Sequence, residues 1–382
     1  MLLSKENITL VNIILIQQCF GAGSIKAVKI FNALRESELL ESELELSELL
    51  LVIEKKDAEK LITFDKDKIY KIIDDCLSNN ICIITACDNN YPNQLRNIVD
   101  YPLALYIKGE CINFDDLPLI SVVGPRKISD FGKKAAFSLA KRLSKAGMVI
   151  VSGAALGADT FAHKGALCAH GKTIAVLGCG ICYDYLSENR ALREEICNNG
   201  CLISEYPPYT AATKYSFPVR NRIISGLSLG TVVIEASLKS GSLITARLAN
   251  DQGRDVFVIP GNPTLENYKG SNALLRDGAI PLLSAYDIFN QYIVKFPDKI
   301  NIEEAFSKEK NTDLKIFKKN LQLDLSNEAK MVYNNLNNEK FTLDDLLILE
   351  LSDDKLISAL TELEIEGIIK ALPGGIYQLI NR

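Results

Sequence analysis

Six short runs of β-branched and other apolar residues constrain the fold of this chain more than any other feature of its sequence. They are LPLISVVG (117–124), MVIVSG (148–153), TIAVLG (173–178), CLISEY (201–206), TVVIEA (231–236) and DVFVIP (255–260). Most end in a glycine or a turn, and helical spacing of apolar residues follows. Near-continuous apolar strands are buried on both faces of a sheet. The runs therefore predict a parallel sheet covered by helices on both sides.

This alternation of strands and crossover helices predicts a Rossmann-like, doubly wound, mostly parallel α/β domain over residues 80–290. The segment 81–110 contains ICIITA and ALYIKG, which we expect to add an extension or an edge strand. Residues 1–75 have apolar residues at helical spacing and predict a small helical domain, similar to SAM or helix-hairpin-helix modules.

The chain becomes polar after the predicted sheet. Residues 291–325 have no clean apolar period, which favours a linker. Residues 326–382 contain two helical patterns and an expected hairpin turned at Pro373-Gly374-Gly375, the order of a C-terminal winged helix. The second of these helical patterns is acidic, which argues against DNA and for a protein partner at this domain.

The net charge of the 382-residue chain is −5, which by itself disfavours a nucleic-acid partner. The charge is uneven, however, because residues 111–290 carry 19 Lys and Arg against 15 Asp and Glu, a net +4, whereas the remainder carries −9. The middle of the chain therefore permits a polyanionic partner without requiring one, since a mild positive excess is also common on solvated surfaces.

Several classes of protein are disfavoured. No stretch approaches the roughly 18 apolar residues that cross a bilayer, so we expect a cytoplasmic protein without membrane association. Ten scattered cysteines fit a reducing compartment. The pairs Cys179/Cys182 and Cys197/Cys201 could suggest zinc, but the chain has only two histidines, and buried thiols fit better. We expect no metal and no cofactor.

Candidate binding residues follow the predicted strands at their carboxyl ends, where open α/β sheets bind ligands. Glycine and serine at such turns leave backbone N–H groups free for an anion, although glycines also close these turns for steric reasons. The candidates are Gly124, Arg126 and Lys127 after the first run, Ser152 and Gly153 after the second, and Ser240, Gly241 and Ser242 after the fifth.

The segment 214–222 combines cations with aromatic residues. It contains Lys214, Tyr215, Phe217, Arg220, Asn221 and Arg222. Cationic groups bind phosphate oxygens, and aromatic rings stack on unpaired bases, so this pattern suits single-stranded nucleic acid. An alternative stays open, in which Phe217 packs its helix against the core and the arginines pair with Glu205 or Glu235.

Three weaker patterns have plain alternatives. The turn Gly21-Ala22-Gly23 resembles the phosphate-binding turn of a helix-hairpin-helix, but a tight helix connection explains it as well. His163 follows Asp159 by four residues and could act as a base, yet no nucleophile accompanies it and a hydrogen-bonding role fits better. The segment 165–173 (GALCAHGKT) resembles a P-loop but precedes a strand, so ATP hydrolysis is unsupported. We expect no catalytic residue.

Seven motifs resemble, in order and spacing, those of the DNA-processing protein A (DprA/Smf) family over roughly residues 80–290. They are SVVGPRKISDFG, SGAALGADTFAHKGAL, GKTIAVLG, SEYPP, FPVRNRIISGLS, EASLKSGSLITARLA and VIPGNP with GSNALLRDGA. The resemblance implies a non-enzymatic recombination mediator that binds and protects incoming single-stranded DNA, helps to load the recombinase RecA during natural transformation, and forms a homodimer. The DNA contacts it implies are Arg126, Ser152, Gly153, Lys214, Phe217, Arg220, Asn221, Arg222 and the turn Ser240-Gly241-Ser242.

The sequence departs from the family pattern at Tyr185-Leu186, where a Tyr-Pro is usual, at Cys182 and at Ala158. A second hypothesis is a nucleotide-hydrolysing enzyme related to lysine decarboxylase-like Rossmann folds, which would use Glu205, Glu235 and Arg220, although the expected PGGxGTxxE segment is missing. A third is an adaptor whose acidic C-terminal domain recruits a partner.

Overall fold

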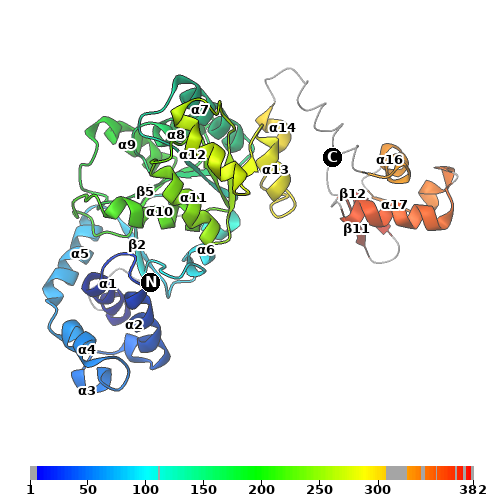
Figure 1. Cartoon of the computed structure of the whole chain (residues 1–382). Coiled ribbons are helices and arrows are strands. Elements are labelled where there is room, and N and C mark those ends of the chain that lie inside the picture. Colours follow the sequence, from blue (N-terminus) through cyan, green and yellow to red (C-terminus); the bar gives the residue numbers. More distant parts are fainter. Residues whose placement is uncertain are drawn as a thin grey trace. The chain divides into compact units, whose positions relative to one another are not determined.

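The computed structural model describes residues 7–110, 112–306, 325–336, 340–349, 351–365, 368–372 and 376–379. The chain divides into two compact units, Met1–Ala305 and Phe306–Arg382 (Figure 1). The first unit holds both the N-terminal helices and the large sheet. The finer domain borders expected near residues 75–80, 290 and 325 stay predictions.

A nine-stranded sheet with the order β1-β2-β6-β5-β4-β3-β7-β8-β9 forms the centre of the first unit. Strands β3 to β9 are parallel, β2 is antiparallel to β6, and β1 is antiparallel to β2. The bounds are β1 Cys82–Thr85, β2 Ala104–Gly109, β3 Leu119–Val123, β4 Val149–Ser152, β5 Thr173–Leu177, β6 Gly200–Ser204, β7 Gly230–Val233, β8 Asp255–Val258 and β9 Ile280–Pro281. The predicted Rossmann-like α/β class is confirmed, and the six apolar runs are β3 to β8.

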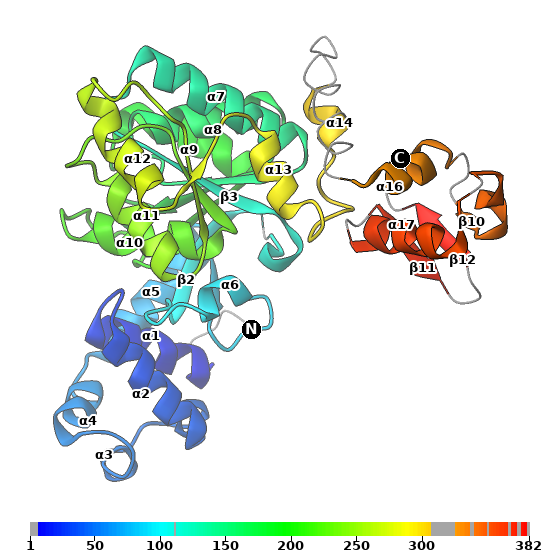
Figure 2. The same cartoon turned by 45° about the vertical axis from the view of Figure 1, so that its right-hand side comes forward.

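Helices cover both faces of this sheet (Figures 1 and 2). On one side α7 (Asp130–Lys145) packs on α8 (Ala158–Cys168), which packs on α9 (Arg190–Asn198), and on the other α10 (Ser216–Leu227) packs on α11 (Ser242–Asp251). Every residue of β3 and β5 is buried, as a strand between two helix layers requires. Strand β3 pairs with β4 on one side and with β7 on the other, so the topological switch point lies at its carboxyl end.

The N-terminal helices pack on the antiparallel edge of the sheet (Figure 2). Their bounds are α1 Ile8–Phe20, α2 Ile25–Glu36, α3 Leu46–Leu49, α4 Lys55–Ile62 and α5 Lys66–Ser78. Helix α1 is buried almost all round, and its Gln17 amide donates to the Ala104 carbonyl oxygen and accepts from the Ala104 N–H. This pairing ties the helical region to strand β2.

The remaining helices and 3₁₀ turns complete the first unit. They are α6 Asn93–Arg96, α12 Glu266–Arg276, α13 Tyr286–Tyr292, α14 Ile302–Ala305 and the 3₁₀ turns η1 Leu39–Glu41, η2 Phe114–Asp116 and η3 Ser187–Asn189. Strand β9 is only two residues long and was not predicted, because so short a run has no detectable periodicity.

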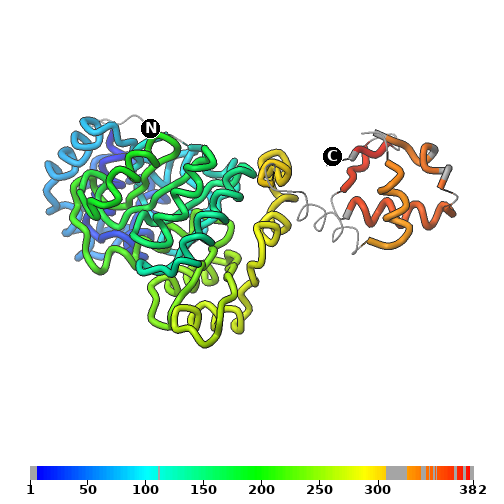
Figure 3. The backbone as a smooth tube through the Cα atoms, turned by 90° about the horizontal axis from the view of Figure 1, so that it is seen from above, coloured from blue at the N-terminus to red at the C-terminus, as the bar shows by residue number. Residues whose placement is uncertain are grey.

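The second unit, drawn in orange to red in Figure 3, combines helices with a small antiparallel sheet of order β10-β12-β11. The bounds are α16 Asn327–Asn334, β10 Lys340–Thr342, η4 Asp344–Leu349, α17 Asp353–Ile365, β11 Ile369–Leu372 and β12 Ile376–Leu379. Leucines of α17 form much of its core. The expected turn at Pro373-Gly374-Gly375 lies outside the described residues, and the winged-helix assignment stays a prediction.

Candidate nucleic-acid interface

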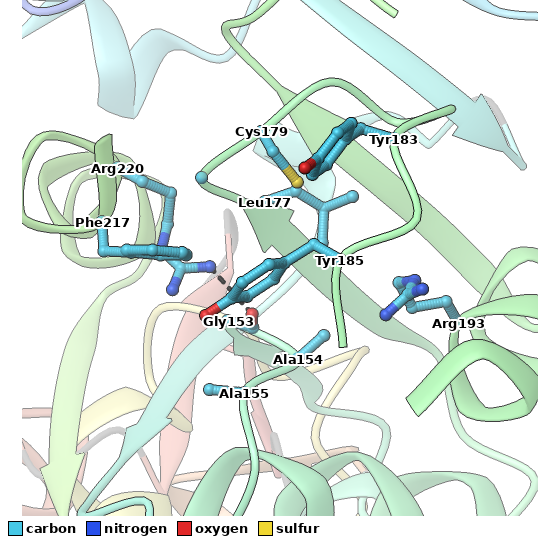
Figure 4. A pocket seen from close by; sticks show the side chains of 11 residues that line it. Gly153, Ala154, Ala155, Leu177, Cys179, Tyr183, Tyr185, Arg193, Phe217 and Arg220 are labelled. Atoms are coloured by element: carbon cyan, nitrogen blue, oxygen red, sulfur yellow. Dashed lines mark hydrogen bonds between the residues drawn. The ribbon is translucent and has the colours of Figure 1, made fainter. Parts of the chain in front are cut away.

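A small pocket opens at the carboxyl ends of β4 and β5 (Figure 4). The turn after β4, the segment after β5 and side chains of α9 and α10 form its walls. The lining residues are Gly153, Ala154, Ala155, Leu177, Gly178, Cys179, Tyr183, Tyr185, Arg193, Phe217 and Arg220. Its cavity volume is about 20 Å³, room for about one water molecule, so a ligand must bind mainly across the rim.

Phe217 is the central ring of this rim. The Arg126 guanidinium carbon lies 5.2 Å from the centre of the Phe217 ring, within the range of a cation–π contact. The Tyr185 ring lies 5.1 Å from it, tilted by 39°. A Cβ at Gly178 would come within 2.8 Å of the Phe217 ring, so only a glycine permits this approach. Arg126 and Phe217, which are far apart in sequence, therefore lie side by side at the same edge of the sheet.

The residues before α10 extend this surface. Lys214 is exposed, and its ammonium group lies 5.0 Å from the centre of the Tyr215 ring. The Tyr215 side chain is 72% exposed, so most of it is free for an external partner. Lys127 is also exposed beyond β3, and Asn221 is half-buried beside Arg220. Arg126, Lys127 and Lys214 are thus the predicted cations that the structure leaves open to solvent.

Arg220 is buried, which corrects its predicted place on an open surface. Its guanidinium group donates to the carbonyl oxygens of Gly153 and Val176, and so joins the ends of β4 and β5. Burial lowers the pKa of Arg220, while the nearby Asp159 carboxylate opposes this. The side chain still borders the pocket, but its bonds to the backbone give it a structural role.

Arg222 is also buried and is turned away from the surface. It forms an ion pair with Glu205, with 2.5 Å between Nη2 and Oε2, and its Nε lies 3.4 Å from Asp100. Burial raises the pKa of the Glu205 carboxyl, and Arg222 counteracts this shift. For this arginine the alternative of an internal pair with Glu205 is therefore the observed one, and the prediction of an exposed cation is wrong.

In the turn after β4, two of the backbone amides already have an internal partner. The Asp159 carboxylate at the start of α8 accepts hydrogen bonds from the N–H groups of Gly153 (3.1 Å) and Ala155 (3.3 Å). The Ser152 hydroxyl donates to the Val122 carbonyl oxygen. Burial raises the pKa of Asp159, and Arg220 and these amides favour its charged form. An internal carboxylate thus occupies the position that we predicted for an external anion.

A second buried carboxylate fills the switch point of the sheet. Glu235, which follows β7, accepts from the Ser129 N–H (2.8 Å), the Ser129 hydroxyl (2.7 Å) and the Asn267 amide (3.0 Å). These bonds engage both oxygens of the carboxylate that the nucleotide-hydrolysing hypothesis would use. This arrangement disfavours the nucleotide-hydrolysing hypothesis and leaves the neighbouring β4/β5 pocket as the candidate site.

The turn between β7 and α11 is accessible only in part, because Ser240 is half-buried and Ser242, predicted at an open surface, is buried. Gly241 is exposed, and a Cβ there would meet no atom within 4 Å. The hydroxyl groups of Ser240 and Ser242 lie 2.8 Å apart and bond to each other. Gly124, beyond β3, is half-buried against Ala158. The predicted anion-binding role of this turn stays a prediction.

His163 is fully buried and hydrogen-bonds through Nδ1 to the Thr173 hydroxyl at 2.7 Å. Burial lowers the pKa of His163 to about 3, so the ring is neutral near pH 7 and has a structural role. Over the described residues, no group of three or more His, Cys, Asp or Glu is arranged to hold a metal ion. Within the same residues, no helix has the length and apolar character needed to span a bilayer.

The pocket is also lined by three residues that were not predicted from the sequence, Tyr183, Tyr185 and Arg193. They belong to the loop and helix that follow β5, and Arg193 donates to the Leu186 carbonyl oxygen. The rule that selected the other loops, reading the residues beyond each strand's carboxyl end, applies equally after Leu177 and would have found the two tyrosines.

Comparisons with known proteins agree with this architecture. Residues 82–293 match the family model of DNA recombination-mediator protein A. The chain is 38% identical over 224 residues to DNA processing protein DprA of Bacillus subtilis, covering 59% of this chain and 75% of the relative.

Two solved structures are also similar. The crystal structure of DNA processing protein A from Streptococcus pneumoniae aligns with a TM-score of 0.65 and 33% identity, covering 74% of this chain and 98% of that one. A solved structure of DNA processing protein A from Helicobacter pylori, which addresses its single-stranded DNA binding mode, aligns with a TM-score of 0.51 and 32% identity. It covers 56% of this chain and 96% of that one. With the family model matching more than half of its length, this chain belongs to the DNA recombination-mediator protein A (DprA/Smf) family.

Proposed function

We propose that this protein binds single-stranded DNA across the rim formed by Arg126, Lys214, Tyr215, Phe217 and Tyr185. The observation that carries the proposal is the convergence of exposed cations and aromatic rings at one edge of the sheet. The single-stranded DNA binding addressed in the Helicobacter pylori relative supports it.

The chemistry of the rim favours an unpaired strand. Exposed lysine and arginine groups attract phosphates, and this attraction weakens with salt. An exposed ring such as Tyr215 stacks on any base that is not held in a duplex. Paired bases do not offer their faces, so the aromatic part of the site adds affinity only for single strands.

The direct test is the affinity of the Arg126→Ala/Lys214→Ala variant for a fluorescently labelled oligothymidine, measured at several salt concentrations. Loss of two phosphate contacts should reduce the slope of log K against log salt by about 1.4, at roughly 0.7 per phosphate for single strands. Lys56→Ala, which removes an exposed charge from α4, is the control. A double variant with the wild-type slope and affinity would refute the proposed site.

We further propose that the bound strand is incoming DNA, that the protein protects it and helps to load RecA on it in the cytoplasm, and that it does so without a catalytic step. Family membership supports this role. Accumulation of RecA filaments on DNA pre-coated with a single-strand binding protein, with and without this protein, is the corresponding measurement. Equal loading in both cases would reject the mediator role.

A homodimer through the surface between α11 and α12 is part of the same proposal. This groove is lined by apolar residues such as Leu238 and Leu274 and by both signs of charge, including Arg247 and Asp277. Mixed charges around apolar residues suit a two-fold contact in which the same patch meets itself. Leu238→Glu should lower the molar mass measured by light scattering, whereas an unchanged mass would exclude this surface.

We also propose that the second unit contacts a protein. Asp353, Asp354 and Glu364 are exposed on α17, and their charge disfavours the phosphate backbone. Neutralising the two aspartates with asparagine should leave the affinity for duplex DNA unchanged, and a clear gain in that affinity would instead indicate a masked DNA-binding helix.

A further inference from the structure

Helix α10 has different partners on two sides. Phe217 and Arg220 border the pocket, while Val219 and Arg222 face the turn that joins α1 to α2. The candidate DNA-binding surface and the N-terminal helices therefore contact one helix, although they are separated by about 200 residues in sequence.

Gly23 makes the closest contact between this turn and α10. A Cβ built at Gly23 would lie 2.8 Å from Val219 Cγ1 and 3.2 Å from Arg222 Nε. The first distance is shorter than real Cβ contacts allow, so glycine is the residue that permits this approach. The φ of Gly23 is +69°, a conformation that also favours glycine.

Hydrogen bonds fix the same junction. The Gly23 N–H donates to Glu205 Oε1 (3.1 Å), and Glu205 Oε2 pairs with Arg222. Gln17 lies in α1, one turn before its C-cap Gly21, and its amide donates to the Glu205 backbone oxygen (3.0 Å). One buried carboxylate thus connects the N-terminal turn, the end of β6 and helix α10.

We propose that the turn Gly21-Ala22-Gly23, through Glu205 and Arg222, is a positioning element for helix α10, so that single-stranded DNA affinity depends on N-terminal residues that do not touch DNA. The turn that resembled a phosphate-binding hairpin uses its Gly23 amide internally instead. The inference rests on the proposed single-strand binding and adds to it a structural link between the N-terminal helices and the binding rim.

The test compares two glycines of the same turn. Gly23→Ala inserts a Cβ against Val219 and Arg222 and displaces α10. It should weaken oligothymidine binding about tenfold, roughly the contribution of one stacked base. Gly21→Ala is the matched control, because Gly21 has φ +85° and nothing within 4 Å of its Cβ position. It strains the backbone without pushing on α10 and should lower Tm while leaving the affinity unchanged.

Removing the contacted atom should rescue the first variant. Val219→Ala deletes the Cγ1 atom that the new Cβ would meet, so Gly23→Ala/Val219→Ala should recover most of the lost affinity. A Gly23→Ala protein that is folded and binds like the wild type would overturn the proposal. So would equal losses of affinity in Gly21→Ala and Gly23→Ala, because general destabilisation would then explain both.

A second variant keeps the proposal testable if Gly23→Ala does not fold. Gln17→Met keeps the length of the side chain but removes its bonds to Ala104 and Glu205. It should also weaken binding, and wild-type affinity in this folded variant would contradict the proposal. The wild-type protein separates the proposed function from the positioning role. If it does not bind single strands, the proposed function is wrong. If it binds them and these variants bind equally well, only the positioning role is wrong.

Discussion

The Arg222 guanidinium and the Glu205 carboxylate form an ion pair with 2.5 Å between Nη2 and Oε2, and each side chain is only 3% exposed. Arg222 belongs to the segment 214–222, which is rich in cations and aromatic rings, yet its side chain is buried inside the protein. Removal of one partner from a buried pair leaves the other charge without compensation, which costs about 3–5 kcal/mol. The two ends of the segment 214–222 therefore have different roles.

Arg222→Ala should lower the free energy of unfolding by about 3 kcal/mol or more, because Glu205 would remain buried without its counter-ion. Urea unfolding followed by circular dichroism measures this loss. Arg126→Ala, which removes an exposed guanidinium, should change stability by less than about 0.5 kcal/mol. If Arg222→Ala has wild-type stability and a reduced salt dependence of DNA binding, then Arg222 contacts DNA and the role assigned to it here is wrong.

Tyr185→Ala should weaken single-strand binding because the Phe217 ring loses its aromatic neighbour at 5.1 Å. Tyr185→Phe keeps the ring and should retain most of the affinity, which separates ring packing from any role of the hydroxyl group. Titration of labelled oligothymidine into both variants gives the comparison. Equal affinity of the alanine and phenylalanine variants would show that this ring does not support Phe217.

Tyr215→Ala should lower affinity for oligothymidine by about 1–3 kcal/mol if the exposed ring stacks on a base. The side chain is 72% exposed, so the free energy of unfolding should not change measurably. Tyr215→Phe preserves the ring and should bind like the wild type. Because the chain has no tryptophan, quenching of tyrosine emission by added DNA offers an independent signal, and that signal should fall in both variants.

His163 predicts a specific dependence of stability on pH. Its pKa is lowered from 6.5 to about 3 by burial, so the unfolded chain binds a proton that the folded chain excludes. The stability contributed by neutral His163 is complete above pH 6.5 and decreases as the pH falls toward 3, by about 1.4 kcal/mol per pH unit.

Between pH 7 and pH 5, the free energy of unfolding should therefore decrease by about 2 kcal/mol less in His163→Asn than in the wild type. The exposed His170 is the only other histidine, and His170→Asn is the natural control. Urea unfolding at the two pH values provides the data. A wild-type pH dependence in His163→Asn would mean that His163 is not the titrating group.

The sheet was predictable from sequence because burial on both faces leaves a direct signature. The apolar runs that begin near Leu117 and Met148 could not lie at a solvated face, and β3 and β4 occupy those positions. Strand order did not follow from the runs alone, since every parallel arrangement with helices on both sides buries them equally.

The site was only partly predictable. Lys214 and Arg126 lie at the rim as expected, but α10 begins at Ser216, and the helix turns Arg220 and Arg222 inward together with Ile223. Their burial depends on the acceptors Gly153, Val176 and Glu205, which are distant in sequence. A local pattern of charges cannot reveal partners of this kind.

The most direct measurement of single-strand recognition compares three ligands of equal length: a single-stranded oligonucleotide, its duplex, and the same sugar-phosphate strand without bases. Stacking on the aromatic rim predicts tighter binding of the first ligand than of either other, and Tyr215→Ala should reduce this difference. Equal affinity for all three ligands at physiological salt would show that only phosphate attraction operates and would contradict the proposed mode of binding.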